Sequence, residues 1–211
     1  MKVTLIRYTE APAEVCGMAA AECYNSTNYE SALKHSAGAG HTSVLEHASF
    51  TFEIEGISRV TLAQLTRHRI ASFSVQSQRY VKLDDPEFVV PETVRNSKYG
   101  AETLSTMRYV MNLYKRLLED GVPVEDARYI TPQAVPTKLM MTMNCRELLH
   151  FFSLRTCNRA QWEIREMADQ MLKICKQKAP EIFENAGPGC VSEHCKEEKP
   201  CGHPRSKEEW S

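Results

Sequence analysis

Residues 48–55, Ala-Ser-Phe-Thr-Phe-Glu-Ile-Glu, constrain the fold most, because apolar and polar side chains alternate along them. Such alternation in residues that favour strands predicts a strand with one buried face, and Gly56 ends it. Residues 137–143, between Pro136 and Asn144, form a second candidate strand. Both segments lie among longer helical patterns. The chain is therefore predicted to fold around a central antiparallel or mixed sheet that is flanked by helices.

Helical patterns occupy most of the remaining chain. Residues 58–69 are predicted to form a helix with Ser58 as its N-cap. The longest pattern, residues 93–119, ends before Gly121 and Pro123. Further helices are predicted over residues 12–24, 29–37, 124–129, 145–157 and 160–178, with a turn over residues 181–186. A chain of 211 residues with this pattern suits one compact domain, with long helices in its C-terminal half.

The composition changes after Gly187-Pro188-Gly189. Residues 190–211 contain Cys, His, Lys and Glu and few apolar side chains, which predicts a polar, mobile tail after a domain over residues 1–189. Two sets of potential metal ligands occur, Cys190, His194, Cys195, Cys201 and His203 in the tail, and His41, Glu46 and His47 in the domain. Neither has the spacing of a strong metal site, so no metal is predicted.

The charges almost balance, with 26 Lys and Arg against 27 Asp and Glu. This balance excludes a protein that coats nucleic acid through bulk positive charge. No apolar run approaches the ~18 residues of a membrane span, and the residues before Arg7 do not resemble a signal peptide. A cytoplasmic protein is expected. Five of its cysteines are predicted to be small buried hydrophobic residues: Cys16, Cys23, Cys145, Cys157 and Cys175.

Arginines concentrate in segments that lack acidic residues. Residues 58–82, 127–146 and 148–162 contain no Asp or Glu, and each holds at least two Arg. Because Arg presents a rigid fork that matches phosphate and carboxylate, local positive charge in a near-neutral protein indicates bound small anions. The alternative is a solvated basic face with surface ion pairs.

Helical geometry separates these arginines. At about 100° per residue, Gln64, Arg67 and His68 share one face of the predicted 58–69 helix, and Arg69 points roughly the other way.

In the 145–157 helix, Arg155 continues an apolar stripe formed by Leu148, Phe151 and Phe152. A guanidinium at the edge of a core needs an anionic or acceptor partner. That partner is either a bound anion or an internal acid such as Glu163.

Residues 67–80 together resemble the signature of the flavin-dependent thymidylate synthases. That signature is Arg-His-Arg, seven residues, Ser, and Arg two positions further on. Here Arg67-His68-Arg69 is followed by Ser77 and Arg79 at these spacings. Three further segments, residues 40–47, 126–132 and 144–164, extend the resemblance over about residues 1–190.

The resemblance implies an enzyme that converts dUMP to dTMP, with a methylene from methylenetetrahydrofolate and reducing equivalents from NADPH through FAD. It also implies α+β subunits that assemble as homotetramers, with active sites where subunits meet. The sequence has no G-x-G-x-x-G motif, so a Rossmann site for FAD is not expected. Two alternatives remain open: a non-catalytic nucleotide- or RNA-binding module that uses the arginine clusters, and a related flavoprotein with a different substrate.

The resemblance assigns site residues by position. Those matched to dUMP binding are Gln64, Arg67, Val75, Gln76, Ser77, Gln78, Arg79, Arg128 and Arg155, and the family supplies Arg128 from a neighbouring subunit. Those matched to FAD binding are His47, Ser49, Arg67, His68, Arg69, Val75, Asn144, Arg146 and His150. Arg155 is matched to the arginine that favours ionisation at N3 of the uracil, and it is the catalytic residue predicted. Val75 departs from the family pattern, because relatives often carry Glu or Gln there.

Overall fold

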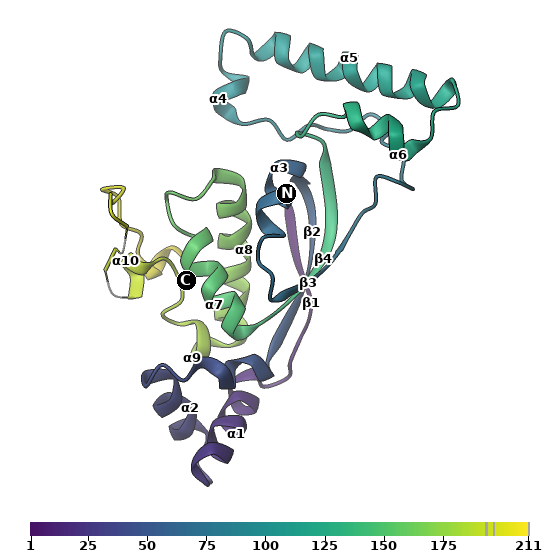
Figure 1. The fold of residues 1–211 in the computed structure, drawn as a ribbon. Helices are drawn as coiled ribbons and strands as arrows, with labels where there is room; N and C mark the ends of the chain where they lie inside the picture. Colours follow the sequence, from purple (N-terminus) through teal and green to yellow (C-terminus); the bar gives the residue numbers. More distant parts are fainter. Residues whose placement is uncertain (193, 196, 211) are drawn as a thin grey trace.

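The computed structural model describes residues 1–192, 194–195 and 197–210. Within them, a four-stranded antiparallel sheet in the order β1-β2-β4-β3 forms the centre (Figure 1). The strands are β1 (Lys2–Tyr8), β2 (Ser49–Ser58), β3 (Ala71–Val75) and β4 (Pro136–Asn144). The predicted α+β class is confirmed, and so are both predicted strands, which become the two central ones.

The outer strands, β1 and β3, are not among the predicted strands. In β1 the pairing with β2 shifts between Leu5 and Arg7, and this irregularity breaks the alternation of apolar and polar residues. In β3 the sequence Ala-Ser-Phe-Ser-Val is short and rich in serine. Edge strands of this kind gain their stability from pairing with a central strand rather than from their own pattern.

One face of the sheet carries the main core. Phe50, Phe52 and Ile54 of β2 are fully buried, and the neighbouring Met141 and Met143 of β4 are buried on the same face. Helices α7 (Cys145–Arg155) and α8 (Trp162–Lys178) lie beside this face (Figure 1). The antiparallel pairing therefore brings the N-terminus of α7, which directly follows β4, to the end of the sheet where β2 begins.

Other long helices are α1 (Pro12–Tyr24), α2 (Tyr29–Gly38) and the 20-residue α5 (Gly100–Glu119). The short helical elements are η1 (Thr42–His47), α3 (Arg59–Leu65), α4 (Glu92–Arg95), α6 (Val124–Ala127), η2 (Arg128–Ile130), α9 (Pro180–Phe183), α10 (Gly189–Ser192) and η3 (Lys207–Trp210). None of the helices in the described part of the chain combines the length and hydropathy that a membrane span requires.

The predicted 58–69 helix is too long. Ser58 is its N-cap, as predicted, and accepts the N–H of Thr61, but α3 ends at Leu65. The Thr66 hydroxyl donates to the carbonyl of Leu62, and the N–H of His68 then bonds three residues back, to Leu65. Because α3 has ended before residues 67–69, the prediction that helical spacing sets the directions of Arg67, His68 and Arg69 is wrong.

The predicted 93–119 helix is also interrupted. The hydroxyl of Ser97 donates to the carbonyl of Val94, and the N–H of Gly100 donates to the carbonyl of Ser97, which closes a turn between α4 and α5. A Cβ at Gly100 would clash with the carbonyl oxygen of Arg95. The chain turns so sharply there that only glycine fits at the start of α5.

Helix α5 lies in an arm beyond one end of the sheet (Figure 1). Met111 and Tyr114 of α5 form a small separate core with Ala127 and Val135. Residues 76–90 lead from β3 to this arm, and residues 131–135 lead from it back to β4. Of the predicted substrate residues, Arg79 therefore lies in the segment that leads into the arm, and Arg128 lies within the arm, at the start of η2.

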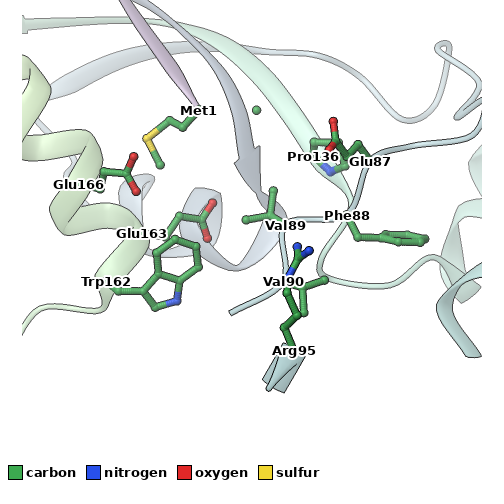
Figure 2. A pocket seen from close by; sticks show the side chains of 11 residues that line it. Met1, Glu87, Phe88, Val89, Val90, Arg95, Pro136, Trp162, Glu163 and Glu166 are labelled. Atoms are coloured by element: carbon green, nitrogen blue, oxygen red, sulfur yellow. The ribbon is translucent and has the colours of Figure 1, made fainter. Parts of the chain in front are cut away.

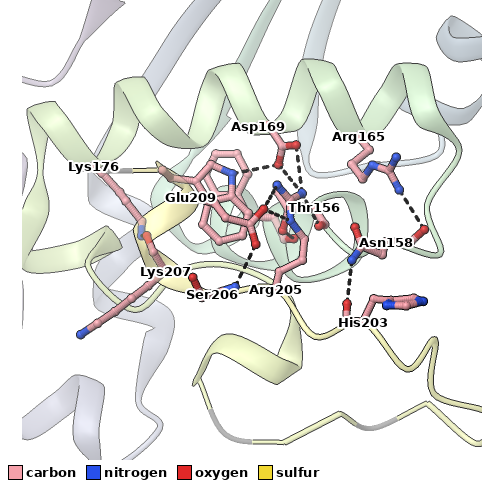
Figure 3. A network of polar contacts seen from close by, with 12 residues as sticks. Thr156, Asn158, Arg165, Asp169, Lys176, His203, Arg205, Ser206, Lys207 and Glu209 are labelled. Atoms are coloured by element: carbon pink, nitrogen blue, oxygen red, sulfur yellow. Dashed lines mark hydrogen bonds and ion pairs between the residues drawn. The ribbon is translucent and has the colours of Figure 1, made fainter.

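The predicted mobile tail is wrong for the end of the chain. Trp210 is 2% exposed, and its indole N–H donates to Asp169 of α8. Arg205 makes two hydrogen bonds to the same carboxylate, at 2.8 and 2.9 Å, and its guanidinium lies 4.4 Å from the centre of the indole ring (Figure 3). A polar segment is thus anchored by one buried aromatic residue and one partly buried ion pair, a pattern that average composition does not reveal.

Replacing Trp210 with alanine is expected to lower the free energy of unfolding by about 3 kcal/mol, because a large buried ring and its hydrogen bond are lost. Urea unfolding of both proteins measures the difference. Trp162→Ala is the matched control, since Trp162 is 38% exposed and should cost clearly less. Equal losses in the two variants would contradict the docked tail.

Candidate active site

A hydrogen-bonded chain of three polar side chains links the segment after α3 to both ends of α7. The Nδ1 of His68 lies 2.9 Å from Oε1 of Glu147, and both side chains are almost fully buried. On the other side of the ring, the Nε–H of Arg155 donates to Nε2 of His68 at 3.0 Å. Arginine offers only donors, so Nε2 must be the acceptor. His68 is therefore neutral, with its proton on Nδ1 and donated to Glu147.

The electrostatics of His68 agree with this tautomer. Burial lowers the pKa of His68 below its usual value, and the positive charge of Arg155 lowers it further, while the hydrogen bond to Glu147 acts in the opposite direction. The exposed His150 adds a smaller lowering effect, and its ring lies edge-on to that of His68 at 5.9 Å. His68 therefore stays neutral near pH 7 and keeps its acceptor for Arg155.

This lowered pKa predicts how stability varies with pH. Below the unfolded pKa of about 6.5, the unfolded chain binds more protons at His68 than the folded chain does. The contribution is complete above that value and is lost as the pH falls toward the folded pKa. His68→Gln should therefore lose less stability than the wild type between about pH 7.5 and about pH 5.5, measured by urea unfolding. Equal losses would show that His68 does not titrate in this way.

Arg155 has a neutral partner and a positive neighbour. Burial lowers its pKa, and the charge of Arg67 lowers it further. The alternative partner Glu163 is excluded, because its carboxylate accepts the N–H and hydroxyl of Ser58, both at 2.6 Å. Among the described residues, no carboxylate forms an ion pair with Arg155. Two neighbouring guanidinium groups without a carboxylate favour binding of an anion.

The residues matched to FAD lie along this same edge, around the N-terminus of α7. Asn144 is the N-cap of α7, and its side chain accepts the N–H of Glu147 at 2.9 Å. Arg146 pairs with Glu46 of η1, and both side chains are about half exposed. His47 is exposed, and Ser49 at the start of β2 is half-buried. Contacts between η1 and α7 therefore bring together two segments that lie about 100 residues apart in the sequence.

The residues matched to the dUMP phosphate form the loop after β3. Val75 pairs with Leu139 of β4 as the last residue of the strand, and the N–H of Gln76 donates to the carbonyl of Lys138 at 2.9 Å. Ser77 accepts the N–H of Arg79 through its hydroxyl at 3.2 Å. This hydrogen bond closes a turn that orients the backbone of the loop. Gln78, inside the turn, is half-buried.

Arg79 and Arg128 meet at one acidic residue of the arm. The Nε–H of Arg79 donates to the carboxylate of Glu125 at 2.8 Å, and the Nε–H of Arg128 donates to its carbonyl oxygen at 3.0 Å. Arg59 also lies close, since the charge of Arg128 lowers its pKa in addition to the effect of burial. This cluster supplies several cations to one place.

The matched residues thus fall into two groups within one chain. The first surrounds His68 and the start of α7, and the second surrounds Glu125. Of the remaining matched residues, Gln64 is half-buried on α3 and Arg69 is exposed in the turn that follows it.

A pocket of about 470 Å³ lies elsewhere, between the N-terminus of α8 and the segment that leads to α4 (Figure 2). Met1, Val89, Arg95, Trp162 and Glu166 are among the residues that line it. None of the residues matched to dUMP or FAD lines this pocket. A second hollow, of about 510 Å³, lies at the start of β2 and includes one matched residue, Ser49.

Two acidic residues of the site are not among the predicted ones, Glu147 and Glu125. Glu147 carries a sequence signal, since Asn144-Cys145-Arg146-Glu147 has the spacing of a helix cap with an acid three residues later. Glu125 carries none, because its contact with Arg79 depends on where the arm folds back.

The structure gives little support for a metal site or a nucleophilic cysteine in the candidate active site. The described residues bring one group of potential metal ligands within 4.8 Å, namely His68, Glu147 and His150, and it contains no member of the two sets that the sequence analysis considered and rejected. Cys145 is fully buried, and burial raises its pKa well above the usual range, which does not suit a nucleophile. Cys16 and Cys175 are buried as predicted, but Cys23 is exposed and Cys157 is half-buried, so the prediction is wrong for these two.

Comparison with known proteins identifies the family. The model of the family described as thymidylate synthase complementing protein matches residues 4–181. The flavin-dependent thymidylate synthase of Geobacter sulfurreducens is 46% identical over 212 aligned residues, covering 93% of this chain and 91% of the relative. The enzymes of the same name from Pyrococcus abyssi and Clostridium tetani are 43% and 39% identical, covering 100% and 93% of this chain and 96% and 91% of their own lengths. The chain therefore belongs to the flavin-dependent thymidylate synthase family.

Proposed function

We propose that this chain catalyses the reductive methylation of dUMP to dTMP, with methylenetetrahydrofolate as carbon donor and NADPH as reductant through bound FAD. The observation that carries the proposal is the guanidinium of Arg155, which bonds to neutral His68 and forms no ion pair with an acid among the described residues, while the charge of Arg67 lowers its pKa. The family relationship gives these cations an anionic ligand. Residues 1–189 form the catalytic domain in this proposal.

The residues around α7 fit a flavin nucleotide. Arg67, Arg69 and Arg146 are exposed and offer guanidinium donors for a pyrophosphate. The exposed pair of Arg146 with Glu46 contributes little to stability, so its carboxylate can be exchanged for a ligand. When bound, FAD would supply the hydride chemistry of the reaction.

The protein residues have positioning and electrostatic roles in this proposal. Ser77, the N–H groups of its loop and Arg79 hold the dUMP phosphate. The guanidinium of Arg155 donates to the uracil and favours the anion at N3, since a fixed positive charge stabilises the ionised form. His68 holds Arg155 through its Nε2 acceptor.

A homotetramer is the proposed assembly. The two groups of matched residues around His68 and Glu125 are the support for it, because subunits that place Arg128 of one chain beside Arg155 of another would join the two groups. Analytical ultracentrifugation should give a mass of about four chains. An active monomer would contradict this part of the proposal.

The alternative is a non-catalytic nucleotide- or RNA-binding module. It predicts tight, salt-dependent binding of oligonucleotides and no flavin spectrum. We expect the purified protein to be yellow, or to become yellow with FAD, and to bind dUMP in preference to oligouridylate. A colourless protein that takes up no FAD would overturn the proposed function and favour the binding module.

A further inference from the structure

We propose that Glu147 is a positioning residue for the reaction, which fixes the His68 tautomer and thereby holds the guanidinium of Arg155 toward the substrate. This inference rests on the proposed function of Arg155. It concerns a residue that does not touch the substrate and acts through two hydrogen bonds.

The first step is the placement of Glu147 itself. It lies in the first turn of α7, and its N–H donates to the side chain of the N-cap residue Asn144 at 2.9 Å. Only 6% of Glu147 is exposed. A buried carboxylate is costly unless its charge is paired or hydrogen-bonded, and the recorded partner of this one is Nδ1 of His68.

The second step is the tautomer. The carboxylate at 2.9 Å accepts a hydrogen bond from Nδ1–H, so the ring has its lone pair at Nε2. If the proton moved to Nε2, the ring would present N–H to the N–H of Arg155, and the two groups would repel. A protonated ring would do the same. Glu147 therefore selects the one state of His68 that can accept from Arg155.

The third step is the orientation of Arg155. Its Nε–H is the group bonded to His68 at 3.0 Å, which leaves the two terminal NH₂ groups of the guanidinium for a ligand. The side chain is half-buried, and Arg67 beside it repels it. Without an acceptor at Nε, this repulsion and the flexibility of the side chain would move the guanidinium away from its productive position.

A double-mutant cycle tests the inference on the holoenzyme. Glu147→Gln keeps the shape of the side chain but removes the charge that selects the tautomer. We expect kcat and kcat/KM for dUMP to fall together by at least about tenfold, as for the loss of an interaction that acts in the transition state. In an Arg155→Lys background, the same change should alter kcat by no more than about twofold, because the bond that it positions is already gone. A merely structural role for Glu147 would lower kcat by the same factor in both backgrounds. The loss of the effect in the Arg155→Lys background therefore distinguishes a positioning role from a structural one.

Glu163→Gln is the matched control, because Glu163 is the other strongly buried glutamate among the described residues, 2% exposed and bonded to Ser58. It should lower the unfolding temperature, and its effect on kcat should be the same in both Arg155 backgrounds. If Glu147→Gln does not fold, Glu147→Asp takes its place in the cycle, because its shorter side chain withdraws the carboxylate from Nδ1.

The outcomes separate two failures. A wild-type enzyme that forms no dTMP overturns the proposed function and this inference with it. An active wild type in which the Glu147 variant keeps full kcat, or loses the same factor in both backgrounds, overturns the inference alone.

Discussion

Arg155→Ala is expected to lower kcat for dTMP formation by about a thousandfold, the scale seen when one charged donor to a developing anion is removed. The reason lies in the setting of the guanidinium. It is half-buried, it is repelled by Arg67, and its described partner is the neutral ring of His68. Its charge is therefore free to act on the uracil. Initial rates at saturating FAD, folate and NADPH measure the effect.

The variant should keep its fold and its flavin, because Arg155 pairs with no carboxylate among the described residues whose charge would be left unbalanced. Flavin absorbance after gel filtration checks this. Arg155→Lys is the graded control, since lysine keeps the charge but lacks the planar fork, and its rate should lie between those of alanine and the wild type. Wild-type turnover in Arg155→Ala would remove the catalytic role.

Arg79→Ala is expected to raise the KM for dUMP by about fiftyfold with a much smaller change in kcat, because a charged hydrogen bond to a phosphate contributes to binding in both the ground and transition states. Arg79 lies in the loop after β3, where Ser77 accepts its N–H. Steady-state kinetics with varied dUMP measure the effect. The substrate without its phosphate, deoxyuridine, supplies a second check, since Arg79→Ala should alter its weak turnover little.

Glu125→Gln is the informative control for this loop. In the structure the carboxylate of Glu125 accepts from Arg79, so it occupies the donor that the phosphate would use. Removing that charge should leave the KM for dUMP unchanged or lower it. A KM that rises as much in Glu125→Gln as in Arg79→Ala would show that the ion pair shapes the loop and that Arg79 does not bind the phosphate.

Much of the fold follows from local pattern. The central strands β2 and β4 and the helices α7 and α8 have strong periodicity, and their predicted positions are confirmed within a few residues. The stripe of Leu148, Phe151 and Phe152 is fully buried, as its spacing predicts.

The remaining elements depend on tertiary contacts. Thr66 ends α3 early through its own hydroxyl, and the long helix is interrupted before Gly100, where the backbone of Arg95, five residues earlier, lies so close that only glycine fits. Trp210 docks a polar tail onto α8, which composition alone does not indicate. In each case, the deciding contact lies outside the pattern that the prediction used.

The site residues also divide into those that the sequence predicts and those whose roles depend on tertiary contacts. Arg67, Ser77 and Arg79 could be named from sequence because their spacing matches a family signature. The bond of Arg155 to His68 could not, because it joins residues 87 positions apart, and neither could the choice of Glu147 rather than Glu163 as the acid nearby. The sequence left either a bound anion or an internal acid such as Glu163 as the partner of Arg155, and the structure places the neutral ring of His68 at its Nε.

The measurement that tests the central claim most directly is the release of tritium from dUMP labelled at carbon 5. Methylation replaces the hydrogen at that carbon, so the enzyme should release tritium and form dTMP when FAD, methylenetetrahydrofolate and NADPH are all present, and form no dTMP when any one is omitted. A flavin-containing protein that releases no tritium and forms no dTMP under these conditions would contradict the account and indicate a different substrate.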